Sequence, residues 1–340
     1  MMRRQVLLIK LTSFGDLIHV LPALTDAYLA NKECLFDWVI DENFQEVAHW
    51  HPAVDRVFTT NHREWRGCLM HLKTYRALKE LVHSIRKEKY DFIIDGQGNF
   101  KTASLALFTK GLRVGYDRHS VREPIAAIAY QKSFAISRKM HAIERLRRLF
   151  AYALEYPLPN TPPNFLINRE KFTKPNYDLP AHYFVFVHNA SWKTKLWPEE
   201  YWKELIQRTT QEGYTILLPW GNEEEKARAN RLAISEQVQV LPKLNLSELG
   251  YILAQSQGNV CVDTGLSHLS AALNVPSITL YGSTDSGLIG ASGFNQIYVR
   301  SSLPCAPCNK KKCMYPQTPL SPPCLAELKP QRIFNLLMQR

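Results

Sequence analysis

The chain has 340 residues, 45% of them hydrophobic, 21% charged and 11% aromatic, a composition that excludes a disordered tail, a collagen-like fibre and a coiled coil. At roughly 100–200 residues per domain, its length predicts two domains. The 42 lysines and arginines exceed the 31 aspartates and glutamates, so the formal net charge of +11 predicts an anionic partner: a nucleic acid, a phosphorylated small molecule or an acidic membrane surface.

Apolar runs typical of strands alternate with amphipathic segments in the first half of the chain. We expect strands within 6–10, 36–40 and 90–98, and helices over 16–30, 101–107 and 142–153. The first apolar run is too short for a signal peptide, and no stretch reaches the roughly 18–20 consecutive apolar residues of a membrane-spanning helix. These features predict a cytoplasmic protein.

Prolines concentrate between Tyr156 and Pro180, where fixed φ angles and missing N–H donors disfavour helices and central strands. Beyond this segment the alternation resumes, with strands expected within 183–188, 215–221, 238–242, 259–265 and 277–282, and helices over 198–209, 225–233, 246–254 and 265–273. We therefore predict two α/β domains, each a doubly wound parallel sheet, with a ligand-binding cleft between them. The predicted boundaries are 1–160 for the N-terminal domain, 161–180 for a linker, 181–325 for the C-terminal domain, and 326–340 for a helix that packs back on the N-terminal domain.

Common nucleotide-binding motifs do not occur in the chain. It has no G-x-x-x-x-G-K-[ST], which excludes a P-loop NTPase, and the pair Gly96 and Gly98 lacks the third glycine of a dinucleotide fingerprint. It also has no D-x-D, which argues against a divalent ion held on a diphosphate by carboxylates.

Two strand-to-helix connections carry carboxylates. Asp16 falls at the start of a helix, where it is either a helix cap or an ionised carboxylate able to accept a proton. Asp263 and Thr264 end a strand, Gly265 permits close backbone approach, and His268 lies in the first turn of the next helix. This second segment is either a routine turn or an anion site at a helix N-terminus.

A third connection, between the strand at 183–188 and the next helix, carries Ser191 and Lys195. A lysine at this place can neutralise a diphosphate leaving group without a metal ion. It can equally be an ordinary surface lysine, and the spacing alone does not separate the two interpretations.

Seven cysteines, an odd number in a chain of this length, do not indicate a disulfide framework. Four of them have the spacing C-x2-C-x4-C-x10-C, at Cys305, Cys308, Cys313 and Cys324. They are either reduced thiols in a proline-rich loop or a structural zinc site with tetrahedral thiolates. We expect no catalytic role for them.

Taken together, these segments resemble the bacterial ADP-heptose:lipopolysaccharide heptosyltransferases of glycosyltransferase family 9, in particular their type I branch. The resemblance rests on VLLIKLTSFGDLIHVLPALTDA (6–27), REP (122–124), HAIERLRRLFA (141–151), KLWPEEYWKELI (195–206), LPWGNEEEKA (218–227) and VDTGLSHLSAALNVPSITLYGSTDSGLIG (262–290). It implies a GT-B fold of two facing Rossmann-like domains. It also implies transfer of L-glycero-D-manno-heptose from ADP-heptose to Kdo of Kdo2-lipid A, with inversion and without a cofactor or a catalytic metal ion.

The resemblance implies a role for each matching position. Asp16 matches the base that deprotonates the acceptor, and Lys195 matches the lysine that contacts the donor diphosphate. The other donor-binding positions that it implies are Ser191, Glu225 at the ribose, Leu244 at adenine, Asp263 at the heptose hydroxyls, and Thr264, Gly265 and His268 at phosphate. Two features depart from the family: Ala190 and Ser191 stand where it has paired threonines, and the segment 305–324 is unlike the usual type I tail.

The basic balance fits an acceptor that carries Kdo carboxylates and lipid A phosphates. The arginines and lysine expected to bind it are Arg63, Arg66, Lys73, Arg113 and Arg122. The segment 61–76 resembles the family's acceptor-side loop and is expected either to contact the inner membrane or to form a solvated surface helix. This implies a peripheral protein on the cytoplasmic face of the inner membrane.

Two other functions stay open on the sequence alone. The same enzyme family includes transferases of the second heptose, which use a different acceptor. A non-catalytic basic module for nucleic acid is the more distant alternative, but no zinc-finger spacing, RNP motif or helix-turn-helix pattern supports it. We therefore expect no nucleic-acid partner.

Overall fold

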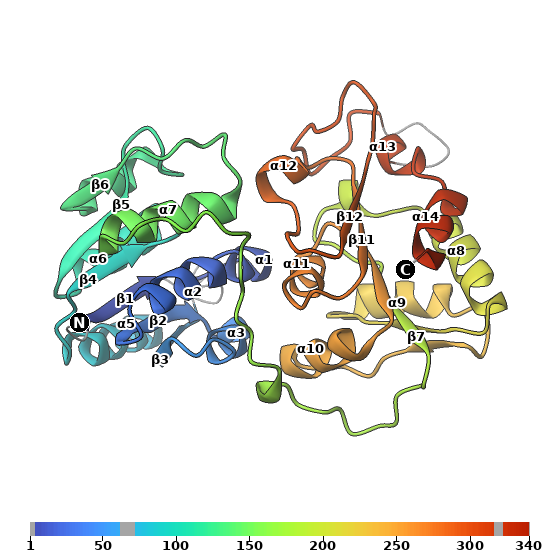
Figure 1. Ribbon diagram of the computed structural model, residues 1–340, viewed down its shortest axis with the longest axis horizontal. Helices are drawn as coiled ribbons and strands as arrows, with labels where there is room; N and C mark the ends of the chain where they lie inside the picture. The colour runs from blue at the N-terminus through green and yellow to red at the C-terminus, as the bar shows by residue number, and fades with distance from the viewer. Residues whose placement is uncertain (1–3, 62–71, 316–321, 340) are drawn as a thin grey trace. The chain divides into compact units, whose positions relative to one another are not determined.

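The computed structural model describes residues 4–61, 72–315 and 322–339, and the chain divides into two compact units, Met1–Asn168 and Arg169–Arg340. The division falls inside the range 161–180, where the prolines predict a linker. Figure 1 shows the first unit in blue to green and the second in green to red, each with helices packed around a sheet. Each unit is thus a sheet-and-helix fold of its own.

The N-terminal unit contains a parallel sheet with the strand order β3-β2-β1-β4-β5-β6. Its elements are β1 (Arg4–Ile9), α1 (Phe14–Ile18), α2 (Leu21–Ala30), β2 (Cys34–Asp41), η1 (Glu42–Phe44), α3 (Gln45–His49), β3 (Val54–Thr60), α5 (Leu72–Arg86), β4 (Phe92–Asp95), α6 (Phe100–Leu107), β5 (Leu112–Tyr116), η2 (Pro124–Ala129), β6 (Lys132–Phe134) and α7 (Ala142–Leu154). The order reverses between β1 and β4, which is where doubly wound sheets bind ligands.

The C-terminal unit repeats this topology in the order β12-β11-β10-β7-β8-β9, with its reversal between β7 and β10. Its elements are η3 (Arg169–Lys171), β7 (Tyr183–Val187), η4 (Lys193–Lys195), α8 (Glu199–Gln211), β8 (Thr215–Leu218), α9 (Glu223–Leu232), β9 (Val238–Val240), α10 (Leu246–Gln255), β10 (Gly258–Val262), α11 (Gly265–Ala272), β11 (Ser277–Tyr281), α12 (Ser286–Ile289), β12 (Gln296–Arg300), α13 (Pro323–Ala326) and α14 (Pro330–Met338). Two doubly wound parallel sheets are the fold that the sequence predicts, while the cleft expected between them stays a prediction.

The central strands form because their side chains are apolar on both faces. Every residue of β7, β10 and β11 is buried, as are the last four residues of β1. Parallel strands covered by helices on both sides read as continuous apolar runs, and each fully buried aliphatic or aromatic side chain contributes about 1.5–3 kcal/mol. The carboxyl ends of these strands are therefore rigid points from which the connecting loops start.

The helix expected over 16–30 is two helices, and this prediction was wrong. Helix α1 ends at Ile18 and α2 begins at Leu21, with Pro22 in its first turn. Proline is favoured in the first turn of a helix because its missing N–H has no partner there, so Pro22 indicated the new start. The break leaves α1 as a short helix that carries Asp16.

The C-terminal helix α14 packs against α8 and β11, and its Ile333 and Leu337 belong to the core of the C-terminal unit. The contact expected between this helix and the N-terminal domain stays a prediction. Among the described residues, no helix has the length and apolarity to cross a bilayer.

Candidate functional site

The loop after β1 is held against the loop after β4, at the point where the strand order of the N-terminal unit reverses. The Oε1 atom of Gln97 accepts hydrogen bonds from the backbone N–H groups of Leu11, at 2.8 Å, and Thr12, at 3.2 Å. Lys10, which is buried, donates from its Nζ atom to the carbonyl of Gly96 at 3.2 Å. These three bonds fix the backbone that leads into α1.

Asp16 lies in the first turn of α1, where it completes a capping box with Ser13. Its Oδ2 atom accepts hydrogen bonds from the backbone N–H of Ser13 at 3.0 Å and from the Ser13 hydroxyl at 2.8 Å. The structure therefore shows the helix-capping role that the sequence allowed. This cap occupies one carboxylate oxygen and orients the half-buried side chain, which leaves a proton-accepting role possible at the other oxygen.

The surroundings of Asp16 keep its carboxylate ionised. Burial raises its pKa, but the positive charge of Lys10, the hydrogen bonds from Ser13 and the neighbouring His19 outweigh burial and lower the pKa to about 2. In return, burial lowers the pKa of Lys10, while the charge of Asp16 opposes this shift. The pair keeps Asp16 ionised in the resting protein at neutral pH, so its carboxylate is free of a proton and able to accept one or a hydrogen bond.

Lys195 and Asp263 meet at the corresponding place in the C-terminal unit. Lys195 ends η4 in the loop after β7, and Asp263 directly follows β10, the strand paired with β7. The Lys195 Nζ atom lies 2.7 Å from Asp263 Oδ2, and the Thr284 hydroxyl donates to the same oxygen at 2.5 Å. His268 Nε2 lies 3.8 Å from Asp263 Oδ1.

This group is nearly enclosed, since the Asp263 side chain is 3% exposed and that of Lys195 15%. A buried carboxylate needs a cation or hydrogen-bond donors, and Asp263 has both in Lys195 and Thr284. Lys195 also lies over the ring of Trp192, with Nζ 4.8 Å from the ring centroid. The ammonium group is therefore held in a defined position from which it can meet an incoming anion.

The remaining donor-side residues predicted from the sequence lie at the carboxyl ends of neighbouring strands. Thr264 is the N-cap of α11, and Gly265 is its first residue. Glu225 lies in the first turn of α9 and accepts a hydrogen bond from the N–H of Gly221 at 2.7 Å. Leu244 is half-buried in the connection between β9 and α10, and Ser191 is exposed in the loop after β7.

The basic residues predicted to bind the acceptor are only partly described. Arg122 is exposed, and its charge acts on Lys10, which places it near the Asp16 site. Arg113 donates from Nε to the carbonyl of Ala129 at 2.8 Å, so part of its guanidinium serves the fold. Arg63 and Arg66, which are also predicted to bind the acceptor, lie outside the described residues, as does the side chain of Lys73.

Three residues of these sites were not found from the sequence: Lys10, Gln97 and Thr284. Lys10 was predicted only as the end of a strand, although a lysine closing a buried apolar run is unusual and was the available signal. Gln97 lies two residues after the end of β4, and Thr284 lies three residues after the end of β11. Because polar residues at the carboxyl ends of central strands line the binding edge of such sheets, their positions were a usable signal too.

The described residues offer no ready-made metal centre at either place. No group of three or more His, Cys, Asp or Glu side chains in the described part of the chain is already arranged to hold a metal ion. At the C-terminal place, the ammonium group of Lys195 and the N-terminal turn of α11 are groups whose chemistry suits an anion.

A family model for glycosyltransferase family 9 (heptosyltransferase) matches residues 78–318. The chain belongs to this family. A lipopolysaccharide heptosyltransferase 1 from Pseudomonas aeruginosa is 42% identical to this heptosyltransferase-family chain over 98% of the chain and 97% of the relative. The lipopolysaccharide heptosyltransferase 1 of Escherichia coli K12 is also 42% identical, over 87% of the chain and 93% of the relative.

Solved structures agree with this assignment. The heptosyltransferase WaaC of E. coli, solved with ADP, matches with a TM-score of 0.87 and 38% identity over 98% of this chain and 99% of that one. E. coli heptosyltransferase II shares the fold at 19% identity, with a TM-score of 0.76 and coverage of 98% and 99%. The predicted family, the two-domain GT-B-like fold and the enzyme class, a glycosyltransferase, are thereby confirmed.

Proposed function

We propose that the chain transfers L-glycero-D-manno-heptose from ADP-heptose to a Kdo residue of Kdo2-lipid A, with inversion at the anomeric carbon, during assembly of the lipopolysaccharide inner core. Its relatives are named lipopolysaccharide heptosyltransferase 1, and WaaC has also been solved with ADP-2-deoxy-2-fluoro heptose, at 36% identity and a TM-score of 0.84. One observation carries the proposal: in each unit a charged side chain lies in the loop at the strand-order reversal. In the N-terminal unit it is the carboxylate of Asp16, which suits a base, and in the C-terminal unit it is the ammonium group of Lys195, which suits a diphosphate.

The donor diphosphate is assigned to the C-terminal unit. Lys195 supplies a fixed positive charge, and the first N–H groups of α11 at Gly265 supply the positive end of a helix dipole. Asp263 is already paired with Lys195, so its proposed contact with heptose hydroxyls uses the oxygen that faces His268. Glu225, anchored in the first turn of α9, is assigned to the ribose, Leu244 to adenine, and Ser191 and Thr264 to the phosphates.

The chemical step requires a base and a stabilised leaving group. The acceptor hydroxyl oxygen of Kdo attacks the anomeric carbon, the bond from that carbon to the diphosphate oxygen breaks, and Asp16 takes the hydroxyl proton. ADP leaves with the electron pair of the broken bond, and Lys195 offsets the negative charge that develops on it. The chain itself supplies both charges, so the proposal needs no cofactor and no catalytic metal ion.

The acceptor is tested by comparing two purified glycolipids. We expect rapid heptose transfer from ADP-heptose to Kdo2-lipid A and little or none to heptosyl-Kdo2-lipid A. Mass spectrometry of the products measures the transfer to each glycolipid. The reverse preference would identify the chain as a second-heptose transferase and overturn the proposed acceptor. The anomeric configuration of the product, determined by NMR, tests inversion in the same experiment.

We also propose that the chain contacts the cytoplasmic face of the inner membrane, where its acceptor is embedded. The membrane contact expected on 61–76 falls mostly outside the described residues. The described residues offer a second surface on α6, the residue after it and η2, which pack together. We call this surface the apolar face of α6 and η2. Its exposed apolar side chains are Phe100, Leu107, Phe108, Ile125 and Ile128. Exposed lysines and arginine beside it are Lys101, Lys110 and Arg122, a charge pattern that suits anionic lipids.

Replacing both Ile125 and Ile128 with glutamate is expected to weaken binding to vesicles of phosphatidylethanolamine and phosphatidylglycerol by about tenfold or more, because each buried isoleucine is worth about 1.5–3 kcal/mol. Co-sedimentation measures the effect. Phe294→Glu is the matched control, since Phe294 is also a large exposed apolar residue, 74% accessible, but lies in the C-terminal unit. Equal binding by the double variant and the wild type would remove this face from the proposal.

A further inference from the structure

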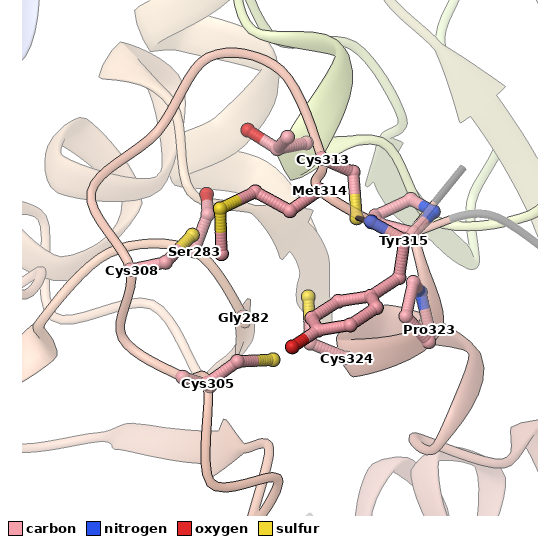
Figure 2. A pocket seen from close by; sticks show the side chains of 12 residues that line it. Gly282, Ser283, Cys305, Cys308, Cys313, Met314, Tyr315, Pro323 and Cys324 are labelled. Atoms are coloured by element: carbon pink, nitrogen blue, oxygen red, sulfur yellow. Dashed lines mark hydrogen bonds between the residues drawn. The ribbon is translucent and has the colours of Figure 1, made fainter.

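Four cysteines of the C-terminal unit line one cavity that the proposed transfer reaction does not use. This cysteine cluster consists of Cys305, Cys308, Cys313 and Cys324. Figure 2 shows their side chains coming from the loop after β12 and from α13 to surround the same space, beside Gly282 at the end of β11. The free space at the centre is about 20 Å³, which suits one ion or one water-sized sphere.

Two backbone N–H groups around the cluster point at its sulfur atoms. The N–H of Tyr315 donates to Cys313 Sγ at 3.4 Å, and the N–H of Leu325 donates to Cys324. Backbone N–H groups that point at sulfur are the usual second layer around metal-bound thiolates, because they spread the negative charge. Gly282 leaves the space for this arrangement, since a Cβ there would lie 2.7 Å from Cys324 Sγ.

Charge and sulfur content point to a soft divalent ion. Four thiolates around one divalent ion carry a net charge of −2, and three lysines, Lys310 to Lys312, lie between the second and third cysteines. Four sulfur ligands without nitrogen or oxygen select zinc or iron in tetrahedral geometry. In the described part of the chain the four sulfurs are not yet arranged as a metal-binding group, so binding requires them to close around the cavity that they line.

We propose that the cysteine cluster binds one tetrahedral divalent ion, with zinc as the probe, and that this ion fixes the described residues 305–315 to Cys324 of the C-terminal unit. Binding replaces the four thiol protons, which pass to solvent, by four metal–sulfur bonds, with no change of oxidation state. This site is structural, and the ion takes no part in the chemical step of the proposed heptose transfer.

The ion would also support the loop that carries Lys195. The carbonyl of Lys310, inside the cluster segment, accepts a hydrogen bond from the Thr194 hydroxyl at 2.7 Å, and Thr194 itself borders the cavity. Asn309 donates from its backbone N–H to the carbonyl of Ser283 at 2.7 Å. The segment thereby joins η4 to the residues after β11, so fixing it restricts both.

The test is metal analysis of the full chain, purified without chelators and without an affinity tag that binds metal. We expect about one zinc or iron per chain by mass spectrometry, and reconstitution with Co²⁺ to give the intense charge-transfer and visible bands of tetrahedral thiolate coordination. Cys308→Ser, at a half-buried position that tolerates the change, is expected to lose the metal and these bands. Cys34→Ser, a buried free thiol in the N-terminal unit, is the matched control and keeps both.

Three outcomes would overturn the proposal. The first is a wild-type chain that holds no stoichiometric metal and in which all four cluster thiols react with a thiol reagent. The second is a disulfide within the cluster, found by peptide mapping. The third is a Cys308→Ser variant that keeps the metal and the cobalt spectrum. Because metal content is measured without substrate, a chain that binds zinc but transfers no heptose would refute the proposed function alone. A chain that transfers heptose but holds no metal would refute the metal site alone.

Discussion

Replacing Asp16 with asparagine is expected to lower kcat/KM for heptose transfer by about 10²–10⁴-fold, because the variant cannot accept the proton of the acceptor hydroxyl. Asparagine keeps the size of the side chain and an oxygen that can accept the capping hydrogen bonds from Ser13. ADP binding, measured by calorimetry, is expected to stay unchanged, since the donor diphosphate is assigned to the other unit. Transfer at the wild-type rate by Asp16→Asn would remove this residue from the mechanism.

A matched control separates the chemistry of Asp16 from its role in the helix cap. Glu248 completes a capping box with Asn245 in the C-terminal unit, so Glu248→Gln changes the same kind of cap elsewhere. We expect that variant to transfer heptose normally and to lose at most about 1 kcal/mol of stability. A comparable loss of turnover in Glu248→Gln would indicate that cap damage, rather than loss of a base, explains the Asp16 variant.

The pH dependence of stability gives a second readout for Asp16. Its pKa is about 2 in the folded protein, below the ordinary value of 3.8, so its charge stabilises the fold above about pH 4 and this contribution is lost as the pH falls through about 2. Asp16→Asn lacks the contribution at every pH. The difference in free energy of unfolding between wild type and variant is therefore expected to narrow as the pH falls below about 4.

The central strands were predictable because burial on both faces leaves an uninterrupted apolar run, as in β7 and β11. Strands β3, β5, β6 and β12 were missed, and all of them except β5 are edge strands of their sheets. Along β3, burial alternates little and most residues are only half-buried. The composition and the hydrophobic period of this segment therefore hardly indicate a strand. Local sequence therefore predicts the middle of these sheets better than their edges.

The candidate sites show the same limit in another form. Asp16, Lys195 and Asp263 could each be placed in a strand-to-helix connection from the local pattern alone. That Lys195 pairs with Asp263 follows only from the adjacency of β7 and β10, which are separated by two other strands in the sequence. Long-range pairs of this kind depend on strand order, and a single sequence does not encode that order in any local period.

Replacing Lys195 with methionine is expected to lower kcat/KM by about 10²–10³-fold and to weaken ADP binding, because the leaving diphosphate loses its fixed positive charge. Initial rates with ADP-heptose and calorimetry with ADP measure the two effects. Lys193→Met is the matched control, since Lys193 is an exposed lysine in the same turn of η4. If both variants lost activity equally, the effect would belong to the general charge of the loop and not to Lys195.

Lys195→Met also removes the partner of a buried carboxylate, so lower activity could follow from lower stability. Asp263 is 3% exposed and would keep only the Thr284 hydroxyl on that oxygen, and breaking a buried pair in this way costs about 3–5 kcal/mol. Adding Asp263→Asn neutralises the orphaned charge, so the double variant is expected to regain most of the melting temperature. It is not expected to regain turnover, because the positive charge on the diphosphate is still missing. Recovery of both would show that the ion pair serves the fold, whereas recovery of stability alone would show that the lost turnover does not come from instability.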